Sequence, residues 1–176
     1  FKSRWVYFDF LCQPPKSVSI LAVTMKDQLI IDADQEGSQV AMRELESFAA
    51  ARIRKGGVDE GDRMTGNLVG AAFLHTTSRS LDPQLHTHFV LFNCTWDKQE
   101  HRWKALQTGD MFGAINYGTE VYRNELVKRL HRIGYATRRT GSAGQTGSAF
   151  EIEGVDAKLI ERFSKRSQQR DLAVKR

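Results

Sequence analysis

The amino-acid sequence predicts an α+β fold, in which a mainly antiparallel β-sheet is flanked by helices. Helix-like and strand-like segments do not alternate strictly along the 176 residues, which argues against a parallel sheet built from repeated βαβ units. Two short segments, 97–101 and the Gly/Ser-rich tract 141–148, separate neighbouring strand-like runs in the way that hairpin loops do. Because no long Pro-, Ser- or Gly-rich linker interrupts the chain, one domain covering residues 1–176 is the simplest division.

Four segments carry helical signals. Pro15 suits the first turn of a helix, because its missing N–H needs no partner there. An apolar stripe from Ala41 to Ile53, followed by two glycines, favours one long helix. Gly134 is a C-terminal signal, and Asp156 is an N-cap candidate. The predicted helices cover 15–23, about 34–55, about 110–133 and a last stretch that begins at 156.

Six segments concentrate β-branched and aromatic residues between turn signals, which is typical of strands. They are 5–12, 67–75, 85–96, 102–106, 135–139 and 149–152. The order of these strands in the sheet does not follow from their spacing.

The composition is that of a globular chain without a membrane span. Hydrophobic residues make up 40% and charged residues 27% of the sequence. No apolar run approaches the roughly 20 residues that a bilayer-spanning helix needs, and the first residues, FKSRW, do not form a signal peptide. With only Cys12 and Cys94, a disulfide framework is excluded. We therefore expect a cytoplasmic protein without membrane insertion.

Basic side chains concentrate in the last third of the chain. The net charge is +5. Residues 123–176 hold 13 Lys and Arg against 6 Asp and Glu, whereas residues 1–122 hold 13 against 15. This asymmetry is compatible with a nucleic-acid partner, and a solvated helix face explains it equally well. Candidate phosphate contacts are Arg123, Lys128, Arg129, Arg132, Arg138, Arg139, Lys165, Arg166 and Arg170, and the candidate stacking residues are Trp96 and Trp103.

Three of the five histidines are spaced to meet in a hairpin. His86 and His88 stand at i and i+2, so on a strand their side chains project from the same face. His75 ends the preceding strand-like run, and a hairpin would place it beside them. Three neutral imidazoles suit a divalent cation and leave coordination positions open for substrate or water. By spacing alone, a hydrogen-bonded surface pair explains His86 and His88 equally well, and Arg79 and Asp82 in the loop are better explained as structural.

One longer motif carries a family resemblance. The segment from Leu74 to His88, LHTTSRSLDPQLHTH, closely resembles the three-histidine signature of the TrwC/TraI-type (MobF) conjugative relaxases, which belong to the HUH endonuclease superfamily. The resemblance covers most of the chain from Trp5 onward and is specific, because the spacing of all three histidines and the SRxLDP linker match together. Further family motifs are resembled by FDF at 8–10, PPKSVS at 14–19, TGNLV at 65–69, RWKAL at 102–106 and FSKRS at 163–167.

The resemblance implies an HUH relaxase (palm-like) fold and metal-dependent, site-specific nicking and transfer of single-stranded DNA. A tyrosine attacks the scissile phosphate, which leaves a 5′-phosphotyrosyl link and a free 3′-hydroxyl. His75, His86 and His88 would hold Mg²⁺, Mn²⁺ or Zn²⁺, and the ion would stabilise the charge that develops on the phosphate. Asp9 matches the family's acidic residue, which orients a ligand imidazole or accepts a proton. Without the motif, Asp9 is an ordinary strand carboxylate.

The nucleophile is where this sequence departs from the family pattern. In the family the tyrosine lies near the start of the chain, upstream of the strand that corresponds to 5–12, and this sequence begins just before that strand. Tyr7, Tyr117, Tyr122 and Tyr135 do not stand at the nucleophile's place. We therefore expect the chain to bind metal and DNA but to lack cleavage activity without an N-terminal tyrosine-bearing segment.

The sequence as a whole predicts the relaxase domain of a conjugative DNA-transfer protein that acts in plasmid transfer, with helicase-like regions beyond residue 176. The expected partners are single-stranded DNA at a transfer origin and other proteins of the conjugation complex. Three alternatives stay open: a non-catalytic DNA-binding module stapled by its metal, a rolling-circle replication initiator of the same superfamily, and a three-histidine zinc hydrolase for small substrates.

Overall fold

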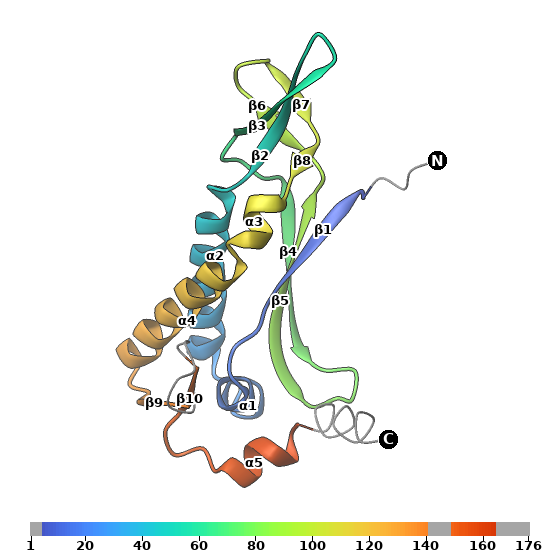
Figure 1. The fold of residues 1–176 in the computed structure, drawn as a ribbon. Coiled ribbons are helices and arrows are strands. Elements are labelled where there is room, and N and C mark those ends of the chain that lie inside the picture. Colours follow the sequence, from blue (N-terminus) through green and yellow to red (C-terminus); the bar gives the residue numbers. More distant parts are fainter. Residues whose placement is uncertain (1–4, 141–148, 165–176) are drawn as a thin grey trace, which may run out of the picture.

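Three long antiparallel strands form the main sheet, in the order β1-β5-β4 (Figure 1). The structure is a computed structural model, and it describes residues 5–140 and 149–164. The strands are β1 (Tyr7–Cys12), β4 (Gly70–Thr77) and β5 (Pro83–Phe92). β5 is the central strand: its residue His88 pairs with Leu11 of β1, and His86 pairs with His75 of β4.

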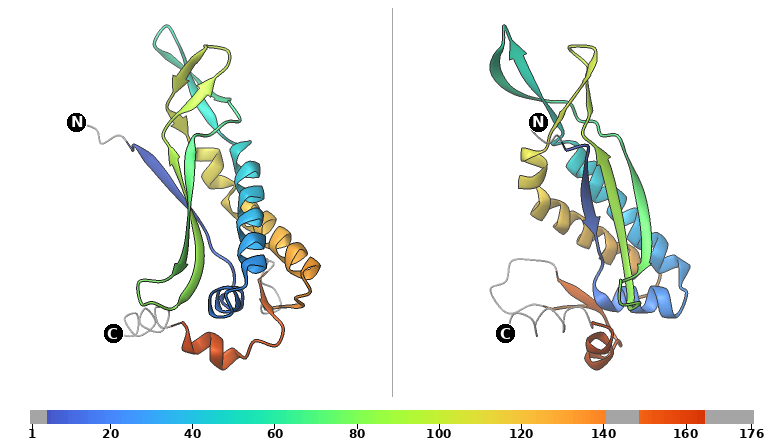
Figure 2. Two further views of the ribbon diagram at one scale, coloured as in Figure 1. Left: turned by 180° about the vertical axis from the view of Figure 1, so that it is seen from behind. Right: turned by 90° about the vertical axis from the view of Figure 1, so that its right-hand side faces the viewer.

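Helices cover one face of this sheet. Figures 1 and 2 show α2 (Gln28–Glu46) and α4 (Ile115–Arg132) side by side on one side of the strands, with α1 (Lys16–Thr24) across the end where β5 begins. Asp27 starts α2, because its carboxylate accepts hydrogen bonds from the N–H groups of Leu29 and Ile30. Among the described residues no helix lies over the opposite face, which we call the open face (Figure 2, right).

Alternation along β5 decides what each face of the sheet carries. Leu85, Thr87 and Phe89 are buried against the helices, whereas His86 and His88 between them are only half-buried and lie on the open face. Behind the sheet, two packed clusters form the core. One contains Val18, Ile30, Leu85, Tyr122, Leu126, Leu130 and Ile152, and the other contains Phe10, Leu45, Phe89, Leu91, Leu106 and Met111.

A second β structure, which we call the ribbon, extends beyond the end of the main sheet where β5 finishes (Figure 1). Gly56 and Gly57 turn its first hairpin with positive φ angles of 56° and 85°, as a two-residue turn of this kind requires. The ribbon consists of β2 (Ala50–Lys55), β3 (Val58–Met64), β6 (Thr95–Asp97), β7 (Arg102–Lys104) and β8 (Leu106–Gln107).

A buried carboxylate joins the two hairpins of the ribbon. Asp97 accepts two hydrogen bonds of 2.9 Å from Arg63 and lies 3.4 Å from Lys104. Burial acts to raise the pKa of Asp97, but hydrogen bonds from the backbone N–H groups of Glu100 and Gln99, together with Arg63, outweigh it and lower the pKa to about 2. Asp97 is therefore ionised throughout the neutral range and holds β3 against β6.

The remaining elements are short. They are α3 (Gly109–Gly113), β9 (Thr137–Arg139), β10 (Phe150–Ile152) and α5 (Ala157–Arg162). Gly134 follows α4 with a φ of 93°, and Asp156 caps α5 through the N–H of Lys158, as the sequence predicts. No helix within residues 5–140 and 149–164 is long and apolar enough to cross a membrane.

The predicted fold class is confirmed, because every strand pair in the described residues is antiparallel and the helices flank the main sheet. The hairpin predicted at 97–101 is present between β6 and β7. The Gly/Ser tract 141–148 and the basic residues 165–170 lie outside the described residues.

The helix predicted for 34–55 is wrong at both ends. It begins earlier, at Gln28, because Asp27 is the cap, and it ends at Glu46. Residues 50–55 form β2 instead, since Ala50 and Ala51 pair with β3 and with β8. The sequence analysis predicted no strand at β3, because this segment is rich in charged residues and does not show the residue pattern of a strand. The helix predicted for 110–133 is interrupted at Ala114, which separates α3 from α4.

Candidate metal centre

The sheet brings the three predicted histidines together on the open face. His75 stands directly across from His86, and His88 is two residues further along β5. The centroids of the imidazole rings are 5.2 Å apart for His75 and His86, 5.5 Å for His75 and His88, and 5.3 Å for His86 and His88. We call this group the histidine cluster.

Hydrogen bonds fix the ring nitrogens of two of these histidines. Nδ1 of His86 lies 2.8 Å from the backbone oxygen of Gln84, which can only accept, so Nδ1 carries the proton. Nδ1 of His88 lies 2.8 and 3.0 Å from the two carboxylate oxygens of Asp9 and donates there in the same way. When a ring carries only this one proton, Nε2 is therefore the nitrogen with a free lone pair. Metal-binding histidines are usually oriented by such a bond from the other nitrogen.

The spacing of the rings fits a shared ion. With metal–nitrogen distances of about 2.0–2.1 Å in tetrahedral geometry, neighbouring imidazole centroids stand roughly 5 Å apart, close to the separations in the histidine cluster. In the part of the chain that the structure describes, no three His, Cys, Asp or Glu side chains already form a set of metal ligands. The ring spacing and the two hydrogen-bonded Nδ1 atoms are therefore compatible with a metal site, although the described side chains do not form a set of ligands as placed.

Asp9 lies on β1 beside the histidine cluster. It stands on β1 with its side chain 43% exposed, and its one polar contact in the described residues is with His88. A carboxylate that accepts from Nδ1 holds the imidazole in one orientation and makes Nε2 a stronger donor to a metal. Asp9 therefore lies where a carboxylate would orient His88 if the histidine cluster binds a metal.

Replacing Asp9 by asparagine is expected to weaken metal binding about 10- to 100-fold, the usual effect of losing a carboxylate behind a histidine ligand. The fold should be retained, because Asp9 is partly exposed on the open face. Calorimetric titration of Mn²⁺ or Zn²⁺ into the two proteins measures the change. Equal affinities for both proteins would show that Asp9 does not support a ligand.

The loop between β4 and β5 is held by its own polar groups. Oγ of Ser78 accepts hydrogen bonds of 3.2 Å from the N–H groups of Ser80 and Asp82, and the N–H of Ser78 donates to the oxygen of Asp82. Lys16 of α1 anchors the start of β5 by donating to the oxygen of Pro83 at 2.7 Å. Asp82 is buried and Arg79 is exposed. The loop thus fixes the register that brings His75 opposite His86.

Three of the four tyrosines have structural partners. Burial, with Asp34 beside it, raises the pKa of Tyr122 well above its usual value. Hydrogen bonds to Glu44 and Asp27 raise the pKa values of Tyr117 and Tyr135, respectively. A raised pKa makes a phenol harder to ionise and so a poorer nucleophile at neutral pH.

The fourth tyrosine, Tyr7, lies on the same strand as Asp9. It pairs with Phe92, four residues along β5 from His88, which is about 13 Å at the usual rise of a strand. The backbone of Tyr7 therefore lies two rows of the open face away from His88.

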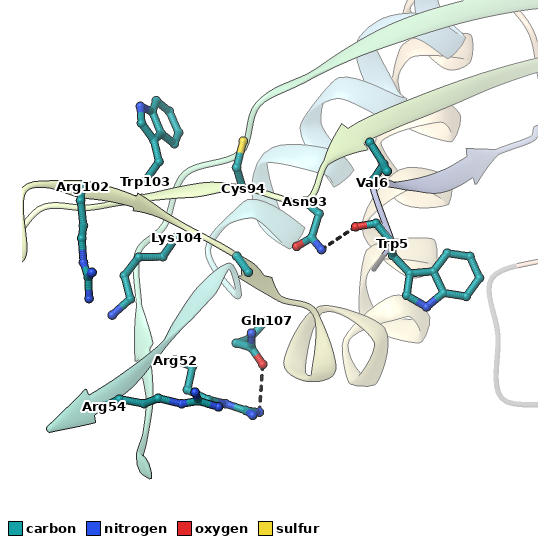
Figure 3. Close-up of a pocket in the computed structure, with 11 residues that line it drawn as sticks. Trp5, Val6, Arg52, Arg54, Asn93, Cys94, Arg102, Trp103, Lys104 and Gln107 are labelled. Carbon is teal, nitrogen blue, oxygen red and sulfur yellow. Dashed lines mark hydrogen bonds between the residues drawn. The ribbon is translucent and has the colours of Figure 1, made fainter. Parts of the chain in front are cut away.

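A second site feature lies at the base of the ribbon, beyond the end of β5 (Figure 3). This open depression of about 900 Å³ is lined by cationic and aromatic side chains, and no carboxylate is among its described lining residues. Asn93 donates a hydrogen bond of 2.7 Å to the backbone oxygen of Trp5, which ties the start of β1 to one wall. We call this feature the basic pocket; its charged and aromatic residues are Arg52, Arg54, Arg102, Lys104, Trp5 and Trp103.

The basic pocket lies on other elements than the predicted positive surface. On α4, Arg123 pairs with Glu120, Lys128 with Glu125, and Arg129 with Glu36 and Glu125, so these cations are partly neutralised. The pocket cations are partly neutralised as well, because Arg52 pairs with Asp59 and Asp62, and Arg102 and Lys104 pair with Glu100. The predicted stacking candidate Trp103 is 57% exposed and lines the pocket. Arg52, Arg54 and Arg102 were missed because residues 1–122 are slightly acidic as a whole. The alternation of arginine along 50–55 is the signal that could have found two of them.

The fold and the histidine cluster define an α+β domain with a candidate metal site on an open antiparallel sheet. The family comparison matches residues 3–176 to the TrwC relaxase family. The chain belongs to this family, as its motif resemblance predicts.

Relatives of known name and structure agree with this membership. The multifunctional conjugation protein TraI of Escherichia coli is 37% identical over 171 residues, which are 92% of this chain and 9% of TraI. The conjugative relaxase TrwC, solved in a metal-bound complex with oriT DNA, is 35% identical with a TM-score of 0.86 over 93% of this chain and 54% of the solved TrwC chain. A complex of TrwC with a 27-mer DNA comprising the recognition hairpin and the cleavage site gives 36% identity and a TM-score of 0.84. The chain thus spans about half of the solved relaxase and about a tenth of TraI.

Proposed function

We propose that this chain is the part of a conjugative relaxase that holds a divalent metal ion and positions the scissile phosphate of single-stranded DNA. The observation that carries the proposal is the histidine cluster, in which three rings lie 5.2–5.5 Å apart. Two of the three rings also have Nε2 set free by hydrogen bonds at Nδ1. The relative TrwC has been solved with metal and with oriT DNA, which supports the same ligands here.

The donor set decides which ions fit best. Three neutral imidazoles favour Mn²⁺ or Zn²⁺ over Mg²⁺, because Mg²⁺ prefers oxygen ligands. When bound, the ion would polarise the phosphate and stabilise its added negative charge. His75, His86 and His88 would hold it from one side, so that the solvent side of the open face stays available to the DNA.

The reaction that we propose is a transesterification. The phenol oxygen of a tyrosine forms a bond to phosphorus, and the bond from phosphorus to the 3′-oxygen breaks. The phenol gives up its proton to solvent, the 3′-oxygen takes one up, and the tyrosine becomes linked to the 5′-phosphate. We place this tyrosine in a segment upstream of residue 1, because Tyr117, Tyr122 and Tyr135 are engaged structurally. Asp9 keeps His88 oriented while this occurs.

The basic pocket gives the proposed DNA substrate a second point of contact. Arg54 can neutralise a phosphate there, and Arg52 and Arg102 can do so by exchanging their present carboxylate partners, Asp59, Asp62 and Glu100. The exposed ring of Trp103 can stack on a base. Because Asn93 of this pocket follows directly after β5, a single strand held in it can continue along the open face to the histidine cluster.

The test is strand cleavage by the full-length protein. Single-stranded oligonucleotides tiled across the transfer origin of the DNA that encodes it should be cut at one position, with a free 3′-hydroxyl and a covalent protein–DNA adduct on a denaturing gel. Removing the metal with EDTA should abolish both products, and Mn²⁺ should restore them. Cleavage only at a replication origin would favour a rolling-circle initiator. Metal-dependent DNA binding without any adduct would overturn the proposal in favour of a non-catalytic module, and DNA-independent turnover of small substrates would favour a hydrolase.

A further inference from the structure

The open face carries large apolar side chains on both sides of His88. Leu11 of β1 and Phe73 of β4 are the residues directly across from His88 on the two neighbouring strands. They are 53% and 52% exposed. Neither is needed by the core, where Phe10 and Phe89 on the opposite face fill the space toward the helices.

The apolar surface continues from His88 toward the basic pocket. The next row of the sheet holds Asp9, Val90 and Ala71, and the row after that pairs Tyr7 with Phe92, which are 55% and 50% exposed. Asn93 of the basic pocket follows immediately. These rows thus connect the two proposed DNA contacts through exposed rings and aliphatic side chains, which Asp9, the half-buried Val90 and Ala71 separate in the middle row.

Such a surface is unusual for the uncovered side of an antiparallel sheet, which normally carries polar residues. Contiguous exposed apolar side chains mark a binding surface. This surface lies beside the histidine cluster, where the proposed function places a DNA phosphate. A nucleotide brings a phosphate for the ion at the histidine cluster and a flat base for the rings, so its chemistry matches both parts of the surface.

The spacing of the strands places Phe73 close to any base whose phosphate is bound at the histidine cluster. Residues directly across neighbouring strands have Cβ atoms about 4.5–5.5 Å apart, so Phe73 and Leu11 lie within one residue's width of His88. A nucleotide whose phosphate rests at the histidine cluster therefore has its own base, or that of its neighbour, within reach of these side chains. A phenylalanine ring on a strand loses little freedom when a base stacks on it.

We propose that Phe73, with Leu11 opposite, is a substrate-positioning residue that holds the nucleobase next to the phosphate bound at the histidine cluster. This inference rests on the proposed function. Beside the contact with the phosphate, this inference adds a contact with the nucleobase, whichever base it is.

The test compares two single-stranded ligands with the same phosphates. One is an oligothymidylate of roughly a dozen nucleotides, within the usual range of single-strand site sizes, and the other is the same backbone with abasic residues. Binding to the Mn²⁺-loaded chain is followed by fluorescence anisotropy. We expect the native chain to prefer the oligothymidylate, and Phe73→Ala to reduce that preference about 5- to 100-fold, the range for one stacked base.

Matched variants separate the explanations. Phe73→Leu keeps an apolar side chain but removes the ring, so it should lose most of the preference while keeping the fold. Leu29→Ala, at an exposed apolar residue of α2 on the helical side, should leave the preference unchanged. If Phe73→Ala and Phe73→Leu bind both ligands as the native chain does, the inference is wrong while the proposed function stands. If the native chain binds neither ligand more tightly with Mn²⁺ than without, the proposed function fails and this inference with it.

Discussion

Replacing His86 or His88 by alanine is expected to lower the affinity for Mn²⁺ or Zn²⁺ by about 100-fold or more. Each change removes one of three imidazole donors, and histidine ligation contributes a large share of the binding free energy at such sites. His88→Ala also leaves the Asp9 carboxylate without its partner. Both histidines are only half-buried on the open face, so the free energy of unfolding without metal should change little.

Calorimetric titration measures the affinities, and thermal unfolding with and without metal gives an independent readout. His131→Ala is the matched control, because His131 lies on α4 and bonds to Thr137. Native affinity in both His86→Ala and His88→Ala would rule out a shared ion at the histidine cluster. A loss of equal size in His131→Ala would show that the effect is not specific.

The second large effect concerns the buried carboxyl of Asp34, which is 1% exposed in the core between α2 and α4. It accepts a hydrogen bond from the hydroxyl of Tyr122, and its other oxygen has no hydrogen-bond partner among the residues that the structure describes. Burial raises the pKa of Asp34 to about 6, although the bond from Tyr122 acts in the opposite direction. The thiol of Cys12 on β1 lies in the same environment, and burial raises its pKa to about 12.

The sign of the pH effect follows from these values. The unfolded chain ionises Asp34 near pH 4 and the folded chain near pH 6, so the folded state binds more protons between these values and stability falls as pH rises through this window. The loss corresponds to about 3 kcal/mol for a shift of this size and is complete above about pH 6. Asp34→Asn, which keeps an acceptor for Tyr122, should remove this dependence.

Urea unfolding at several pH values between 4 and 7 tests the expectation as the difference between the native chain and the variant. Asp32→Asn, two residues away on the exposed side of α2, should follow the native curve, since that carboxylate remains in water. Parallel pH curves for the native chain and Asp34→Asn would contradict a buried carboxyl with a raised pKa.

The histidine cluster could be predicted from the sequence because its geometry is local. Two residues at i and i+2 share a face of any strand, and a hairpin brings His75 to them. The contact of Asp9 with His88 could not be derived in this way, since the two residues are 79 positions apart and only the family resemblance pointed to it. Pairing of β1 with β5 is a tertiary event that no periodicity encodes.

The misplaced helix and the missed basic pocket have related causes. Ala49, Ala50 and Ala51 continue the apolar pattern of α2, and alanine is compatible with either structure, so pairing with β3 and β8 decided the outcome. Arg52 and Arg54 of β2 line a pocket because β7 folds beside them. This arrangement depends on the ion pair between Arg63 and Asp97. Charge counted along the chain does not reveal such neighbours.

Core side chains and imidazoles alternate on β5, so every second residue packs against the helices and the residues between them lie on the open face. Deleting one residue between Leu85 and His88 would turn ring nitrogens inward and leucine or phenylalanine outward. This one-residue shift would disrupt both the packing of the core and the histidine cluster. Evolution can therefore lengthen the loop before Pro83, but it cannot move the histidines by single-residue steps without rebuilding the interior.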